Sequence, residues 1–257
     1  WYGNDEDGVT IPAAGIETAP GQNVTLNARC NGGGAVAGWI DWNHNGVFDP
    51  AEKSAQVTCD GRSNATLRWT VPEDVVRSID GETGSQPHTY LRVRTAKAGV
   101  DLKPTGSTMD GEVEDYRLAV RVPTIQLVKN VQAPYTGQVK ALGADQWTLK
   151  AQQGNGGAAS LQVTGTVDTG IKVTRPGQYG LSESSTNLQA SGYEASAWRC
   201  SQTPGTVGNW GGSSLSGSTI QVRGTDRITC SVTNTTKPGA LSWTKVDQDG
   251  QTPLGGT

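Results

Sequence analysis

The chain has 257 residues, with 35 glycines and eight tryptophans but only one methionine and one phenylalanine. Its formal net charge is −3 at pH 7, and no basic patch with interleaved aromatic residues is present, so nucleic acid is not an expected partner. The sequence has no apolar run long enough to span a bilayer, so we expect no membrane insertion of this segment.

Short segments rich in Val, Thr and Trp alternate with Gly, Pro and Asn, and helical periodicity is not sustained anywhere. This pattern predicts an all-β protein, and the length suits two tandem β-sandwich domains. We place the first domain at residues 1–121 and the second at residues 122–236, with a short hinge at residues 121–123. Residues 237–257 are expected to be a linker and the truncated start of a further domain.

Residues 41–52 have the spacing of a twelve-residue calcium loop, with oxygen-bearing side chains at the ligand positions and Gly46 at the sharp turn. A hard cation needs about six to eight oxygens that converge from a tightly turned backbone. The expected cofactor is therefore Ca²⁺, and the alternative is an ordinary Asn/Gly-rich turn. We expect His44 to face solvent. The predicted ligands are the side chains of Asp41, Asn43, Asn45, Asp49 and Glu52 and the carbonyl of Val47.

Two further acidic runs, at residues 4–7 and 110–115, raise the question of a second metal site. Solvated acidic loops explain these runs equally well on charge grounds.

The four cysteines lack the CxxC spacing of a zinc site, and they divide evenly between the two halves of the chain. Each continues the inward-facing alternation of its strand, which places the sulfur atoms in sheet interiors. We therefore predict the disulfides Cys30–Cys59 and Cys200–Cys230, which imply an oxidising compartment outside the cytoplasm. The alternative is four buried thiols in a cytosolic protein.

Three polar residues of the second domain, Lys129, Glu183 and Asn234, lie at inward positions of strands whose other inward residues are apolar. Burial favours a neutral lysine, which is a nucleophile, and a protonated glutamate, which can polarise an amide. The three groups could thus form a Lys129–Asn234 isopeptide bond with Glu183 as catalyst. A lysine whose side chain reaches solvent at a sheet edge is the alternative for Lys129.

The string Gly-Glu-Val-Glu-Asp-Tyr at residues 111–116 resembles the signature of the GEVEDY domain family of bacterial surface proteins. Residues 5–9 and 38–43 match the same family pattern, so the resemblance covers nearly all of residues 1–120. It implies secretion and display on a cell surface.

Residues 123–236 resemble the Cna B-type, transthyretin-like domains of Gram-positive pilins and adhesins, through residues 127–129, 177–183 and 229–235. The resemblance implies that the first and last strands are parallel neighbours, joined by a Lys–Asn isopeptide bond that an acidic residue promotes. The pair Cys200 and Cys230 resembles a disulfide-bearing actinobacterial subset of that family.

Together these resemblances imply a wall-anchored, extracellular adhesin or pilus-tip segment rather than an enzyme. Its expected partners are a protein or glycan on a host or neighbouring cell and other pilus or wall subunits. The alternatives are a pair of passive stalk modules, a carbohydrate-binding module and a eukaryotic glycoprotein. The carbohydrate-binding alternative rests on Trp39, Trp42 and Trp69, and the glycoprotein alternative on the sequons at Asn23, Asn64 and Asn234.

Overall fold

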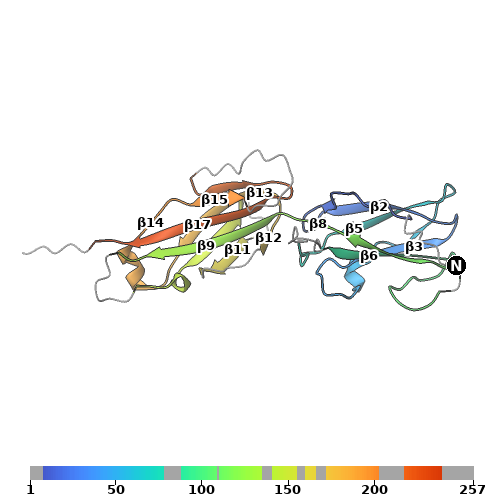
Figure 1. Ribbon diagram of the computed structural model, residues 1–257, viewed down its shortest axis with the longest axis horizontal. Coiled ribbons are helices and arrows are strands. Elements are labelled where there is room, and N and C mark those ends of the chain that lie inside the picture. Colours follow the sequence, from blue (N-terminus) through green and yellow to red (C-terminus); the bar gives the residue numbers. More distant parts are fainter. Residues whose placement is uncertain are drawn as a thin grey trace, which may run out of the picture.

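The computed structural model describes residues 8–77, 88–108, 110–134, 141–154, 160–165, 172–202 and 217–238. In this part of the chain the regular structure is β, apart from short 3-10 turns, as the composition predicts. Figure 1 shows two β-sandwiches joined end to end. No helix among these residues is long and apolar enough to cross a membrane. The acidic run at 4–7 and the expected opening of a third domain at 239–257 lie outside the described residues.

The first domain contains one four-stranded sheet, ordered β4-β3-β6-β7, one β2-β5 pair and a short parallel β1-β8 pair. Its elements are β1 (Ile16–Glu17), β2 (Asn23–Arg29), β3 (Ala35–Ile40), η1 (Pro50–Glu52), β4 (Val57–Thr58), β5 (Asn64–Thr70), β6 (Thr89–Ala96), β7 (Val113–Leu118) and β8 (Val120–Arg121). Strands β2 and β5 alternate strictly between exposed and buried residues, which is the pattern of a strand with one face on the core.

The core of the first domain depends on close approach between its sheets at Gly38. A methyl group at Gly38 would lie 2.7 Å from Cζ2 of Trp69, so only glycine fits at this point of β3. The indole N–H of Trp69 donates to the carbonyl of Glu52 at 3.0 Å, which fixes the end of the predicted calcium loop to the core.

The second domain has two sheets, ordered β11-β10-β13-β16 and β12-β9-β17-β14, with β15 also paired to β17. Its elements are β9 (Thr124–Gln132), η2 (Ala144–Gln146), β10 (Thr148–Gln153), β11 (Ser160–Thr164), β12 (Lys172–Val173), β13 (Gly177–Ser184), η4 (Leu188–Gly192), β14 (Tyr193–Ala195), β15 (Arg199–Gln202), β16 (Thr219–Val222) and β17 (Arg227–Thr236). The first strand, β9, and the last strand, β17, are parallel neighbours over nine residue pairs.

The connection between the domains differs from the hinge expected from the sequence. Val122 is fully buried in the core of the first domain, and Pro123 is buried beside it. Only these two residues separate β8 from β9, and Val173 of the second domain packs against the first core. The connection is therefore a packed joint, because its apolar side chains are covered by both domains.

Candidate functional site

The second domain brings Lys129, Glu183 and Asn234 to one side of its core, as the alternation predicts. Lys129 on β9 is fully buried, and its Nζ lies 2.5 Å from Oε2 of Glu183 on β13. Asn234 on β17 is 4% exposed. The prediction that all three residues point inward is confirmed for Lys129 and Asn234, and Glu183 is half-buried.

Strand register explains why Lys129 and Asn234 are neighbours. In the parallel β9-β17 pair, Lys129 is opposite Val232, so Asn234 lies two residues further along on the same face. Residues related by such a diagonal on one sheet face are close enough for long side chains to meet. The parallel pairing that the family resemblance implies is therefore present.

Burial lowers the pKa of Lys129, and the nearby Glu183 carboxylate partly offsets this effect. The face of the Trp147 ring also covers the amine, with Nζ 5.0 Å from the ring centroid. Trp147 in turn packs edge-on against Tyr193, with ring centroids 5.2 Å apart. The lysine amine is thus shielded from solvent. Its neutral form is more strongly favoured there than in an exposed lysine.

The carboxamide of Asn234 has an unsatisfied group in this pocket. Among the described residues, its buried Oδ1 has no hydrogen-bond partner. A buried, unpaired carbonyl oxygen costs about 1–3 kcal/mol, so an adjacent proton donor would find a ready acceptor there. The lysine amine consequently contacts an acid–base group, and the Asn234 amide lies two residues along on the same sheet face.

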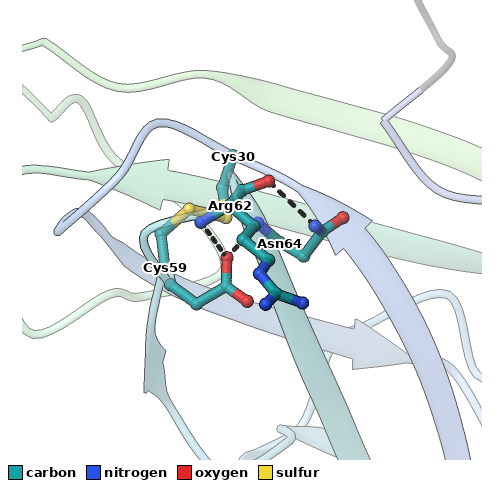
Figure 2. Close-up of a disulfide and its surroundings, with 5 residues drawn as sticks. Cys30, Cys59, Arg62 and Asn64 are labelled. Carbon is teal, nitrogen blue, oxygen red and sulfur yellow. Dashed lines mark hydrogen bonds between the residues drawn. A yellow bond between two sulfur atoms is a disulfide. The ribbon is translucent and has the colours of Figure 1, made fainter.

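Both predicted disulfides are present. Cys30–Cys59 joins the end of β2 to the end of β4, and Cys200–Cys230 joins the paired strands β15 and β17. Figure 2 shows the turn next to the first disulfide, where the N–H groups of Arg62 and Asn64 both donate to Oδ1 of Asp60 at 2.8 Å. The described residues contain no free cysteine.

The predicted calcium loop is tightly curled around Asp41. The N–H groups of Asn45 and Gly46 donate to the two carboxylate oxygens of Asp41, at 3.1 and 3.0 Å. Asn45 N–H also lies 3.1 Å from Oδ1 of Asn43, and Gly46 has the positive φ of 79° that the sharp turn requires. The side-chain oxygens at the start of the loop are thereby directed to its inside.

Glu52, at the end of the loop, is held by the backbone rather than turned freely toward a cation. Its carboxylate accepts the N–H of Trp42 at 2.8 Å and that of Asp49 at 2.9 Å, and the residue is 2% exposed. Burial raises the pKa of Glu52, while these two N–H groups lower it. Throughout the described ranges, no three Asp, Glu, His or Cys side chains converge as a ready-made metal cluster. The Asn43 and Asn45 side-chain oxygens accept backbone N–H groups within the loop, whereas both Glu52 oxygens are engaged by N–H groups at its ends.

His44 does not lie fully in solvent, contrary to the expectation from the sequence. It is half-buried with a φ of 57°, and burial lowers its pKa. Its position in the curled loop brings the ring against the protein, which the loop spacing alone did not predict.

The acidic run at 110–115 is used for contacts within the first domain. Glu114 accepts a hydrogen bond from the Tyr116 hydroxyl, which itself accepts the Val9 N–H at 3.0 Å. Asp115 forms two hydrogen bonds with Arg92, at 2.7 and 2.6 Å. The Gly-Glu-Val-Glu-Asp-Tyr motif thus joins β7 to the N-terminal segment and to β6, which is a structural role.

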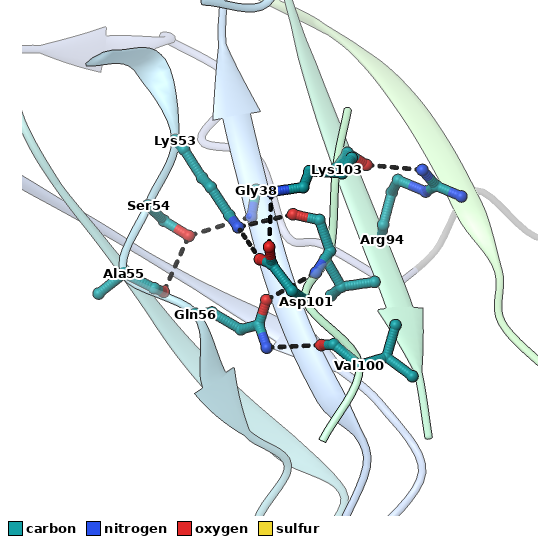
Figure 3. A network of polar contacts seen from close by, with 10 residues as sticks. Gly38, Lys53, Ser54, Ala55, Gln56, Arg94, Val100, Asp101 and Lys103 are labelled. Atoms are coloured by element: carbon teal, nitrogen blue, oxygen red, sulfur yellow. Dashed lines mark hydrogen bonds and ion pairs between the residues drawn. The ribbon is translucent and has the colours of Figure 1, made fainter. Parts of the chain in front are cut away.

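Residues 97–108, in the connection from β6 to β7, are fixed to the first domain by side chains that the sequence pattern did not single out. Arg94 donates to the carbonyls of Lys103, Thr105 and Gly106, at 2.6, 3.0 and 2.7 Å. Figure 3 shows Lys53 and Gln56 reaching the same connection from the segment that follows the calcium loop.

The tryptophans that suggested a carbohydrate site are in the core. Trp39, Trp42 and Trp69 are at most 3% exposed, so they present no aromatic surface to a sugar. The buried position of Asn234 likewise makes its sequon unsuited to glycosylation, whereas Asn23 and Asn64 are exposed.

Comparison with protein families divides the chain in the same way as the structure. Residues 35–119 match the model of the GEVED domain, and residues 121–232 match that of a prealbumin-like fold domain. The chain is a GEVED domain followed by a prealbumin-like domain. A comparison with curated proteins gives no match.

Solved structures of several bacterial proteins are loosely similar to the GEVED and prealbumin-like pair. An adhesin from Mobiluncus mulieris, containing intramolecular disulfide, isopeptide and ester bond cross-links, shares 11% identity over 84% of this chain and 90% of its own, with a TM-score of 0.30. The T6 backbone pilin of serotype M6 Streptococcus pyogenes shares 8% identity over 90% of this chain and 65% of its own, with a TM-score of 0.35. The Bacillus anthracis TIE protein shares 15% identity over 96% of this chain and 44% of its own, with a TM-score of 0.29.

Proposed function

We propose that the chain is an extracellular, wall-anchored segment of a bacterial adhesin or pilus tip, braced against unfolding by covalent and metal cross-links. The two disulfides support an oxidising location. The GEVED domain would face a protein or glycan on a host or neighbouring cell, or another wall subunit, and the prealbumin-like domain would act as its spacer.

The observation that carries this proposal is the Lys129, Glu183 and Asn234 pocket, because it supports a self-formed covalent brace. In the reaction, Nζ of Lys129 attacks Cγ of Asn234, the Cγ–Nδ2 bond breaks and ammonia leaves. Glu183 takes a proton from the attacking amine and delivers one to the leaving nitrogen, so it is regenerated. The product is an amide between Lys129 and Asn234.

Burial supplies the driving conditions for this chemistry. Lys129 is fully buried, its pKa is lowered by that burial, and Oδ1 of Asn234 lacks a partner. An ionised lysine at this depth would pay a desolvation cost of several kcal/mol. Conversion of the amine to an amide removes a group that could otherwise ionise there.

Intact mass spectrometry of the reduced, denatured chain tests the brace. We expect the wild-type protein to weigh one ammonia less than its sequence. Glu183→Ala should restore the full mass, while Glu194→Ala, at an exposed glutamate of β14, should not. Full mass in the wild-type protein would leave a buried ion pair in place of the bond.

In the GEVED domain, we propose that Ca²⁺ binds the loop at 41–52 through Asp41, Asn43, Asn45, the Val47 carbonyl, Asp49 and Glu52. The curled backbone around Asp41 supports this assignment. Ion binding would require Glu52 to be ionised and to share its oxygens between the cation and the two backbone N–H groups. Loops of this kind in extracellular modules operate at about 10⁻⁴–10⁻³ M calcium.

A further inference from the structure

One buried arginine crosses the joint between the two domains. Arg77 belongs to the GEVED domain and is 6% exposed. Its Nη1 donates to the carbonyl of Val122 at 2.5 Å and to that of Thr225, in the prealbumin-like domain, at 3.1 Å. One guanidinium group therefore connects the last residue of the first core to a loop of the second domain.

Another side of the joint is open. A groove of about 540 Å³ is lined by residues 19–22 of the GEVED domain and by Gln153, Arg175 and Pro176 of the prealbumin-like domain. The Glu73–Arg175 ion pair crosses between the domains here, but Glu73 is largely exposed. Exposed ion pairs stabilise by only about 0–1 kcal/mol, so the buried Arg77 is the stronger polar contact.

The segment that carries Arg77 is attached at its other positions to the predicted calcium loop. We name residues 71–77 the strap. Within it, the N–H of Val76 donates to the carbonyl of Trp42 at 2.8 Å, and Asp74 accepts from Nδ2 of Asn43 at 3.3 Å. Val75, between these two contacts, anchors the strap in the core. The strap thus contacts the loop through residues 74 and 76, and it contacts the second domain through Glu73 and Arg77.

The Asn43 carboxamide faces the loop with one atom and the strap with the other. Its Oδ1 accepts the Asn45 N–H inside the loop, while its Nδ2 donates to Asp74. An ion that bound Oδ1 would hold the amide in this orientation, and thereby hold the strap. The carbonyl of Trp42, between the ligand positions 41 and 43, would be fixed by the same event.

We propose that the strap couples the calcium loop to the joint, so that calcium sets how firmly the two domains are held in line. This rests on the proposed calcium site. The energetic basis is conformational entropy. When the ion orders the loop it also orders the strap, so less entropy is lost when Arg77 binds the carbonyls of the joint. Because coupling is reciprocal, a closed joint must strengthen calcium binding by the same factor.

The test combines calorimetry with NMR residual dipolar couplings on the full chain, in calcium and in chelator. With calcium, we expect both wild-type domains to report one common alignment. In chelator, the degree of alignment measured for the prealbumin-like domain should be smaller than that measured for the GEVED domain. Arg77→Ala should show the divergent alignment in both conditions and weaken calcium binding about fivefold, the lower end of usual coupling energies.

Two further variants separate the explanations. Arg62→Ala removes an exposed arginine at the disulfide turn and should behave as wild type. Asp74→Ala removes the exposed acceptor of Asn43 and should weaken the effect of calcium on alignment without unfolding the domain.

The outcomes are distinguishable from failure of the calcium site. No calcium heat in the wild-type chain would overturn the site and the coupling together. Calcium heat with the same alignment in calcium and chelator would overturn the coupling alone. A common alignment in a folded Arg77→Ala variant would overturn the role of Arg77.

Discussion

At the scale of single residues, Glu52 links a structural role to the proposed metal site. Its carboxylate caps the N–H groups of Trp42 and Asp49 and is nearly inaccessible to solvent. Burial raises its pKa above the ordinary value of 4.5, despite the two N–H donors. Without a cation, folding therefore favours the protonated form.

This direction of shift predicts how pH affects the GEVED domain. A group whose pKa is raised by folding stabilises below its unfolded pKa, and the contribution is lost as pH rises through the folded pKa. In chelator, the melting temperature of this domain should therefore fall as pH rises from about 4 through the raised pKa of Glu52. Calcium should reverse the fall, because the ion favours the ionised carboxylate.

Glu52→Gln is the variant for this measurement, since it keeps the shape and removes the charge. Calorimetric melting should then show a flatter pH profile in chelator and no stabilisation by calcium. An undiminished calcium shift in Glu52→Gln would exclude this residue as a ligand.

Tyr116 follows the acidic run that raised the question of a second metal, and its contacts are structural. Burial, and then its hydrogen bond to Glu114, raise the pKa of the phenol well above its ordinary range. The hydroxyl therefore stays protonated and can both donate to Glu114 and accept the Val9 N–H.

Tyr116→Phe should destabilise the GEVED domain by about 1–3 kcal/mol, because it leaves the buried Val9 N–H without its acceptor. Tyr90→Phe, at a residue that is 48% exposed, is the matched control and should change stability by less than about 0.5 kcal/mol. Urea denaturation measures both. Equal effects of the two substitutions would contradict the assigned role.

Sequence alternation could predict the inward direction of Lys129 and Asn234, because period two is a local property of a strand. It could not predict Arg77, whose carbonyl partners lie 45 and 148 residues away in the chain. Trp147 was within reach of the same reasoning: it precedes the buried Leu149 and Ala151 at a spacing of two, and only its contact with Lys129 required the structure.

At the scale of elements, β17 combines three strand pairings with a disulfide. It pairs with β9 on one side and with β14 and β15 on the other, and it carries both Cys230 and Asn234. The disulfide lies within the chain segment that a Lys129–Asn234 bond would close. The position of the connection after β6 could not be predicted from the sequence. Arg94 fixes this connection through backbone carbonyls, which every residue has and which therefore leave no sequence signature.

Removal of the disulfides should lower the stability of both domains. Each closes a loop of similar length, with separations of 29 and 30 residues. The chain-entropy model then gives about 3–4 kcal/mol for each. The loss should be smaller in the prealbumin-like domain if its unfolded chain is already closed by the isopeptide bond.

Calorimetry on two double variants, Cys30→Ala with Cys59→Ala and Cys200→Ala with Cys230→Ala, assigns each loss to its domain. We expect each double variant to lower one melting transition and to leave the other nearly unchanged. A loss of equal size in both domains would argue against the second closed loop.

At the scale of the whole molecule, the two domains would respond differently to tension. In the GEVED domain the disulfide closes only residues 30–59. Roughly 85 residues of this domain lie outside the closed loop and can extend when it unfolds. In the prealbumin-like domain a Lys129–Asn234 bond would carry the force from β9 directly to β17. Only a few residues at each end would then extend.

Single-molecule pulling on the oxidised chain, between its two ends, tests this account most directly. We predict one unfolding step, with a contour-length gain on the order of 250–300 Å at about 3.4 Å per residue, from the GEVED domain. Glu183→Ala should add a second step of similar length, from the prealbumin-like domain. Two such steps in the wild-type chain would contradict the proposed covalent brace.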